Sequence, residues 1–213
     1  MAEALQLPDG SARRAARGVV SATALVSALG LAAELGEYVF GAPEGWVELF
    51  SLSYEENVPT WYVSVLLAFC ALGCLALRSQ RGDRRWTVLA VLFLYVSLDE
   101  AVQIHEHAAF FATRGVLYFS WVIPAAAVVA LLAIWLGPWI LRLPAPLRRR
   151  LVVSAALYVG GALGMELPLG WWTDHHGDDN LGYGLIDWVE ETLELSGASV
   201  FLLSVWADAE ARA

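Results

Sequence analysis

Long apolar runs alternate with short polar, arginine-bearing segments along the chain. Six runs are long enough for a helix of about 20 residues, the length that crosses a bilayer core roughly 30 Å thick. They lie at about 18–40, 60–78, 86–112, 116–142, 151–170 and 182–207. The pattern predicts an all-α polytopic membrane protein, with a bundle of six transmembrane helices over 18–207 and short tails at 1–17 and 208–213.

The basic residues predict the orientation of this bundle. All 13 are arginines, and if the chain starts in the cytoplasm and crosses six times, every one except Arg114 falls at the cytoplasmic end of a helix. Cytoplasmic loops carry an excess of Arg and Lys, so both termini are predicted to be cytoplasmic. An arginine bias without lysine is also typical of GC-rich bacterial genomes, and we therefore expect a bacterial inner (plasma) membrane.

Composition narrows the functions that the chain can have. Hydrophobic residues make up 58% and charged residues 16%, against roughly 45–50% and 25% in soluble domains. This excludes a disordered chain, a nucleic-acid binder and an ordinary soluble enzyme. Without lysine there is neither a P-loop lysine nor a retinal Schiff base, so we expect no nucleotide and no retinal. Cys70 and Cys74 share one helix face, and packing residues are favoured over a zinc site.

Carboxylates inside the predicted helices are the most informative feature, because ionisable groups are expensive in a bilayer and mark functional sites. At about 1.5 Å per residue, Asp99 and Glu166 lie roughly 20 and 22 Å above the inner ends of their helices, and Glu190 roughly 18 Å above the inner surface. Three helices thus carry acids at one level in the outer half of the bilayer. We expect a proton- or cation-binding cluster of Asp99, Glu100, Glu166, Glu190, Glu191 and Glu194.

Further polar residues are predicted to form a rim above this cluster. A continuous helix over 86–112 would place Asp99 and Gln103 on one face, and Asp187 begins a stripe with Glu190 at helical spacing. The rim comprises Glu34, Gln103, His105, Glu106, His107 and Asp187.

Two other segments have predicted local roles. Gly160, Gly161 and Gly164 predict a helix-packing face that ends next to Glu166. Thr60, after Asn57-Val58-Pro59, is predicted to cap the second helix.

An outer loop over 174–180 is rich in oxygen and imidazole groups. A solvated loop is the favoured interpretation, with a cation site as the alternative. The ligands of that alternative would be Asp174, His175, His176 and Asp178.

No arginine lies inside any predicted helix, so the clustered acids have no internal basic partner except histidine. Close carboxylates at low dielectric must be protonated, neutralised by a bound cation or solvated by water. A divalent metal ion is one alternative, held by Asp99, Glu100, Glu190 and Glu194, and oxygen ligands would favour Mg, Ca or Mn.

Three stretches of the chain resemble an uncharacterised bacterial family of small, six-span membrane proteins. They are 56–62, Glu-Asn-Val-Pro-Thr-Trp-Tyr; 97–106, with the pattern S-L-D-E-x4-H-E; and 189–197 in the last helix. The resemblance implies a role for the acids inside these motifs, and for His105, but no chemistry.

Three functions remain open at this stage. A small transporter or channel would bind protons or divalent cations, but it needs a polar path below Glu194, for which Ser27, Ser64, Ser154 and Ser204 are the candidates. An intramembrane metal-dependent enzyme, hydrolase-like, would act on a lipid-borne substrate. An accessory or structural subunit would use protonated acids to hold helices together. The expected partners are membrane lipids and protons or metal cations; a homo-oligomer is compatible with each function.

Overall fold

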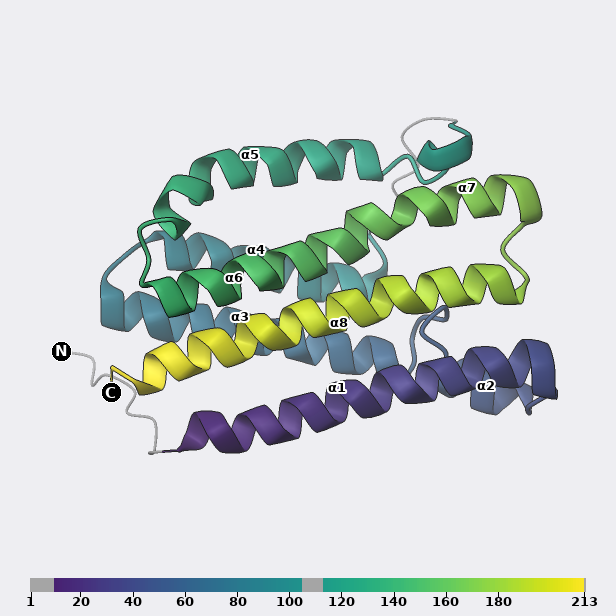
Figure 1. Cartoon of the computed structure of the whole chain (residues 1–213), viewed down its shortest axis with the longest axis horizontal. Helices are drawn as coiled ribbons and strands as arrows, with labels where there is room; N and C mark the ends of the chain where they lie inside the picture. Colours follow the sequence, from purple (N-terminus) through teal and green to yellow (C-terminus); the bar gives the residue numbers. More distant parts are fainter. Residues whose placement is uncertain (1–9, 105–112, 213) are drawn as a thin grey trace.

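The computed structural model describes residues 10–104 and 113–212, and their secondary structure is entirely helical, as predicted (Figure 1). His105, Glu106 and His107 lie outside the described residues. The elements, with three short 3-10 or π-helical segments labelled η, are α1 (Ser11–Leu35), η1 (Gly36–Phe40), α2 (Glu44–Phe50), α3 (Val58–Arg81), α4 (Arg85–Val102), η2 (Gly115–Leu117), α5 (Val122–Ile140), α6 (Ala145–Val159), η3 (Gly160–Met165), α7 (Glu166–His176) and α8 (Leu181–Glu210).

Four helical segments are long and apolar enough to cross a membrane, as expected of a membrane protein. They are Ser11–Phe40, Val58–Arg81, Val122–Ile140 and Ala145–His176. The other two predicted segments correspond to α4 and α8, which run alongside them (Figure 1). The first and the last of these four segments continue through the π-helical segments η1 and η3 rather than stopping there.

Two predicted helix ends are wrong. The helix predicted over 86–112 ends at Val102, because Gln103 takes the left-handed conformation (φ 56°) and donates its N–H to the carbonyl oxygen of Asp99 at 2.6 Å. Helical angles therefore do not place Gln103 on the face of Asp99. At the start of α3 the capping side chain is Asn57, whose Oδ1 accepts the Thr60 N–H at 3.1 Å.

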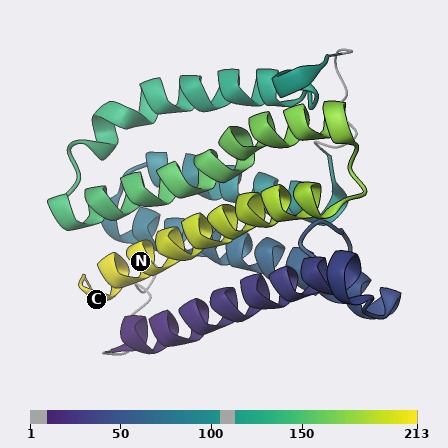
Figure 2. The ribbon, with the colours of Figure 1, turned by 45° about the vertical axis from the view of Figure 1, so that its right-hand side comes forward.

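Helix α8 lies in the middle of the bundle and packs against α1, α3, α6 and η3 (Figures 1 and 2). Between α8 and α3 lies a tightly packed part of the core. The side chains that are fully buried there are Leu67, Cys70, Cys74, Leu195 and Val205. The Cys70 thiol also donates a hydrogen bond to the Ala198 carbonyl oxygen at 3.4 Å. The cysteines are thus packing residues, and both are free.

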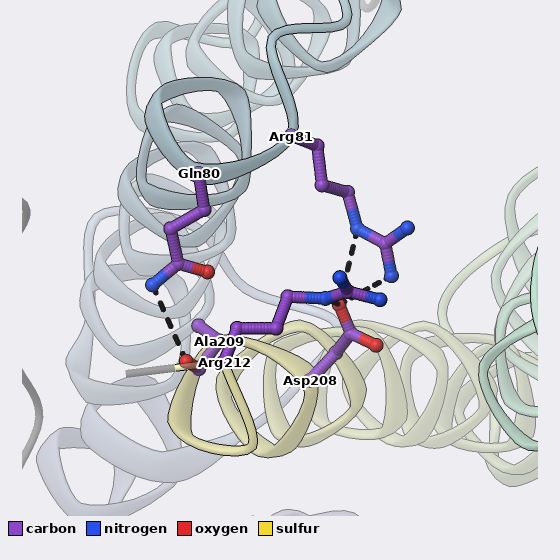
Figure 3. Close-up of polar contacts among 5 residues, drawn as sticks. All are labelled: Gln80, Arg81, Asp208, Ala209 and Arg212. Atoms are coloured by element: carbon purple, nitrogen blue, oxygen red, sulfur yellow. Dashed lines mark hydrogen bonds and ion pairs between the residues drawn. The ribbon is translucent and has the colours of Figure 1, made fainter.

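Polar contacts tie the arginine-bearing end of α8 to its neighbours. The Asp208 carboxylate accepts hydrogen bonds from Arg81 of α3 at 2.5 Å and from Arg212 at 2.9 Å, and Gln80 donates to the Ala209 carbonyl oxygen (Figure 3). The Glu210 carboxylate accepts the Ser11 backbone N–H at 2.8 Å and so caps the start of α1. This end of the bundle is held by charge-assisted hydrogen bonds, which are stronger than neutral ones.

Helix α5 lies at the edge of the bundle and packs sparsely along most of its length (Figures 1 and 2). It is held at its arginine-bearing end, where the Trp139 ring meets the Trp86 ring edge-on with 5.0 Å between the ring centroids. Leu131, Ile134 and Trp135 are exposed, as apolar side chains are when they face lipid. The space left between α5 and the remaining helices forms the cavity described next.

Candidate functional site

One large cavity lies between α4, α5, the α6–η3–α7 rod and α8, with a volume of about 1370 Å³. Eight acidic residues line it, and no basic residue does so among the parts of the chain that the structure describes. The acidic residues are Glu55, Asp99, Glu100, Glu166, Asp187, Glu190, Glu191 and Glu194. The structure therefore brings together all six members of the predicted cluster, and Asp187 of the predicted rim with them.

Helix α8 carries half of these acids as a stripe of one face. Asp187, Glu190 and Glu194 are 9%, 5% and 9% exposed, so these three are buried, while Glu191 is half-buried. The Glu190 Oε2 atom is buried and has no hydrogen-bond partner among the described residues. Buried polar atoms almost always have a partner, and this one belongs to a carboxylate that lines the cavity.

A close contact between η3 and α8 fixes Glu166, which follows η3, relative to the acids of α8. A Cβ atom added at Gly161 would lie 2.8 Å from the Glu190 carbonyl oxygen and 2.8 Å from Glu194 Cγ. Only glycine allows this approach. The predicted face of three glycines is wrong, however. Nothing lies within 4 Å of a Cβ at Gly160, and a Cβ at Gly164 would meet only the Val159 carbonyl oxygen at the end of α6. The π-helical i to i+5 geometry changes which glycine faces α8.

Glu166 follows η3 directly and reaches the cavity from the α7 side. Its Oε1 accepts a hydrogen bond from the indole Nε1–H of Trp121 at 3.1 Å, which joins the start of α5 to α7. The 3-10 turn η2, just before α5, packs on α7 as well, where Gly170 lies close to Tyr118. These contacts hold the start of α5, next to the carboxylates, whereas the middle of α5 is sparsely packed.

Glu34, predicted at the rim, occupies a separate buried position. It is 1% exposed, and its Oε1 accepts hydrogen bonds from the Ser51 and Ser53 hydroxyls at 2.6 and 3.2 Å. Its carboxylate also lies directly against Gly184 of α8. Neither Glu34 nor Gln103 lines the cavity. The depth estimate from the sequence carried no information on the neighbour that Glu34 faces.

A related contact lies in the loop between α2 and α3. The Tyr54 hydroxyl donates a hydrogen bond to the Glu37 carboxylate at 2.8 Å. This hydrogen bond, together with partial burial, raises the pKa of Tyr54 to about 12.

The outer-loop residues proposed as an alternative cation site are engaged in local contacts. The Asp174 carboxylate accepts the Gly115 backbone N–H at 2.9 Å. His175 stacks on Trp171 and His176 on Trp172, with ring centroids 4.7 and 4.3 Å apart. Within residues 10–104 and 113–212, no three His, Cys, Asp or Glu side chains are arranged to hold a metal ion. This gives no support to a metal in the loop or at Asp99, Glu100, Glu190 and Glu194.

Below the acids the cavity is apolar, lined by residues such as Leu136, Ile140, Leu151 and Phe201. The serines expected to continue a polar path bond elsewhere. Ser204 donates to the Val200 carbonyl oxygen, Ser27 pairs with Thr192, and Ser64 with Ser97. Ser154 does line the cavity, but its hydroxyl donates to the Gly197 carbonyl oxygen at 2.8 Å.

Sequence reasoning missed several residues that line the cavity, notably Glu55, Trp121, Tyr158 and Tyr183. Glu55 lies next to the 56–62 motif, which was the available signal. The other three are aromatic residues: Trp121 precedes α5, Tyr158 is in α6 and Tyr183 is in α8. That they line a cavity can be seen only from the packing of these helices.

The comparisons with known proteins bear on the whole helical bundle. A family model described as "Domain of unknown function (DUF8692)" matches residues 12–208. The chain belongs to this family. The DUF8692 match extends from α1 to the last turns of α8, so it includes every residue that lines the cavity. No curated protein and no solved structure matches the chain. Membership in DUF8692 agrees with the expected resemblance to an uncharacterised family and adds no activity.

Proposed function

We propose that the protein is an integral membrane protein that crosses a bacterial plasma membrane six times, with both termini in the cytoplasm. Four helical segments meet the length and hydropathy needed to cross. Helix α8 has 30 residues, about 45 Å at 1.5 Å per residue, and it runs through the middle of the bundle (Figure 1). The arginines at the end of the bundle where Asp208 lies would then be on the cytoplasmic side of the membrane.

Within this arrangement the cavity is a binding site in which buried carboxylates take up protons or a cationic group, and its function is the transport of a small molecule. Glu190 carries this proposal: it is 5% exposed, its Oε2 has no hydrogen-bond partner within the described chain, and seven further acids line the same cavity. An ionised carboxylate buried without a partner costs several kcal/mol. A proton or a bound cation removes that cost.

A proton or an organic cation fits better than a divalent metal. A metal site needs several ligands converging on one point, and the described residues offer no such group. Proton uptake needs only one buried carboxyl, and an organic cation needs only acceptors along a cavity wall.

The experiment follows both protonation and flux in Glu190→Gln. Infrared spectra of the purified protein should show a protonated-carboxyl band that disappears in Glu190→Gln. Proteoliposomes that contain this variant should lose the proton flux that the wild type shows. Glu44→Gln, at an exposed carboxylate in α2, is the matched control and should behave like the wild type. If Glu190→Gln leaves both the band and the flux unchanged, the proposed function is wrong.

A second function is supported by the apolar lower half of the cavity. An intramembrane enzyme that acts on a lipid-borne substrate needs a blind polar end and no path to the cytoplasm, and the four serines are all bonded elsewhere. Lipid extracts incubated with the wild type and with Glu190→Gln distinguish the two functions. If only the wild type forms a new lipid product, and proteoliposomes show no proton flux, the protein is an enzyme and not a transporter.

A further inference from the structure

We propose that the cavity binds a long-chain amine, a single-chain amphiphile whose cationic head lies at the carboxylates and whose chain lies along α5. This inference deepens the proposed function, on which it rests, by naming the class of the transported molecule.

The first support is the shape of the cavity. The α5 residues that line it run from Trp121 to Leu141, a length of about 30 Å at 1.5 Å per residue. The acids and Trp121 lie at one end, and Leu136, Ile140 and Leu151 at the other. A long space that is polar at one end and apolar at the other matches an extended amphiphile rather than a compact solute.

The second support is size. The cavity volume of about 1370 Å³ exceeds the roughly 300–1,000 Å³ of sites for drug-sized ligands. A bare proton or metal ion would need only the carboxylate end and would leave the apolar part without a role. A chain of lipid length uses both parts.

The third support is charge. Eight acids and no basic residue line the described cavity, so an anionic head such as a phosphate or carboxylate meets repulsion. An ammonium group brings three hydrogen-bond donors and no acceptor. The buried Glu190 Oε2, which has no protein donor within the described residues, is the acceptor that such a head needs.

The test measures equilibrium binding of tritiated hexadecylamine to the full chain in detergent, with unlabelled butylamine and hexadecyl phosphate as competitors. Hexadecylamine should bind saturably, and both competitors should be at least about tenfold weaker. Glu190→Gln should weaken the binding about tenfold or more, because charge-assisted hydrogen bonds are the strong ones.

A pair of α5 variants tests the apolar half. Ala130 and Ala133 are both exposed residues of α5, about one turn apart, but only Ala133 lines the cavity. Ala133→Phe should weaken hexadecylamine binding about tenfold, while Ala130→Phe should bind like the wild type. Since Glu190 is untouched in both, its protonated-carboxyl band should remain.

The outcomes separate this inference from the proposed function. If butylamine binds as tightly as hexadecylamine, or if Ala133→Phe and Ala130→Phe bind alike, the chain does not occupy the apolar half and the inference is overturned, although a cation site at Glu190 would stand. Equal competition by hexadecyl phosphate would overturn the assignment of a cationic head. If Glu190→Gln also leaves both the carboxyl band and the flux unchanged, the proposed function itself fails.

Discussion

The contact between Gly161 and α8 allows a sharp test of how the site is held together. Gly160 and Gly161 are neighbours in the same π-helical segment, but only Gly161 faces α8. Replacing each in turn by alanine adds one methyl group to the same type of backbone. Gly161→Ala brings that methyl group against the Glu190 carbonyl oxygen, whereas Gly160→Ala places it in open space.

The magnitude follows from the geometry. A Cβ at Gly161 would lie 2.8 Å from the Glu190 carbonyl oxygen and 3.2 Å from the Glu194 backbone nitrogen. These are backbone atoms, so the two helices must separate, and overpacking of this kind costs about 1–3 kcal/mol. Alanine also gains up to about 1 kcal/mol of helix propensity over glycine. That gain is common to both variants, so the difference between them isolates the contact at about 1–3 kcal/mol.

The chain contains a probe for this measurement. Cys70 and Cys74 are its only cysteines, and both are fully buried between α3 and α8. A thiol reagent should label them only when the bundle opens, so labelling across a series of SDS concentrations reports the unfolded fraction. Each 1.4 kcal/mol changes that equilibrium tenfold. We expect Gly161→Ala to be labelled at lower SDS than the wild type, and Gly160→Ala at equal or higher SDS.

Two results would refute the reasoning. If both variants are labelled at the same SDS concentration, η3 does not pack on α8 through Gly161. If Gly160→Ala is the less stable variant, the register of the π-helical segment differs from that described. In either case the relative placement of Glu166 and Glu190 would lose its basis.

Three further predictions use other parts of the bundle. Arg81→Ala should lower the unfolding free energy by about 1–3 kcal/mol, because it removes a charged hydrogen bond to Asp208. Arg85→Ala removes the more exposed ion pair with Asp83 and should lower it by under about 1 kcal/mol. Unfolding in SDS compares the two variants. Glu34→Ala should destabilise by about 1–3 kcal/mol because it leaves the buried Ser51 hydroxyl without its acceptor, whereas Glu34→Gln, which keeps an oxygen there, should cost less; equal losses would contradict the role of this hydrogen bond. The neutral Tyr54 phenol is favoured in the fold because its pKa is raised to about 12, so its contribution to stability is present below about pH 10 and is lost as the pH rises through about 12; phenolate absorbance, with Tyr54→Phe as the reference, should show this pKa falling towards about 10 in Glu37→Gln.

The sequence was a good guide to the helices and to the carboxylate cluster. Apolar runs of bilayer length indicate membrane-spanning helices. Charged groups buried in a membrane are costly, so acids inside such runs are expected to lie together. Depth along three separate helices predicted that Asp99, Glu166 and Glu190 lie at one level, and in the structure all three line one cavity.

What the sequence could not predict depends on local backbone geometry. Helix α4 ends at Gln103 in a left-handed conformation, without the glycine or asparagine that usually signals such an end. The π-helical segment η3 breaks the 3.6-residue period, so that Gly161 rather than the Gly160–Gly164 pair faces α8. Glu34 faces Ser51 and Gly184 and does not line the cavity, because rotation about the helix axis is set by neighbours that a hydropathy pattern does not contain.

The distribution of partners explains why the cavity has one firm wall and one yielding wall. At the arginine-bearing end, Asp208 is bonded to Arg81 (Figure 3). Glu210 accepts the backbone N–H of Ser11 at the start of α1, and the two contacts fix α8 there. Further along, Gly161 locks η3 onto α8, so the wall that carries Glu190 is held at both levels. Helix α5 has no comparable contacts along its middle. A molecule that enters from the bilayer would therefore displace α5 while the carboxylates stay in place. Moving α8 includes breaking part-buried charged hydrogen bonds, and moving the middle of α5 does not.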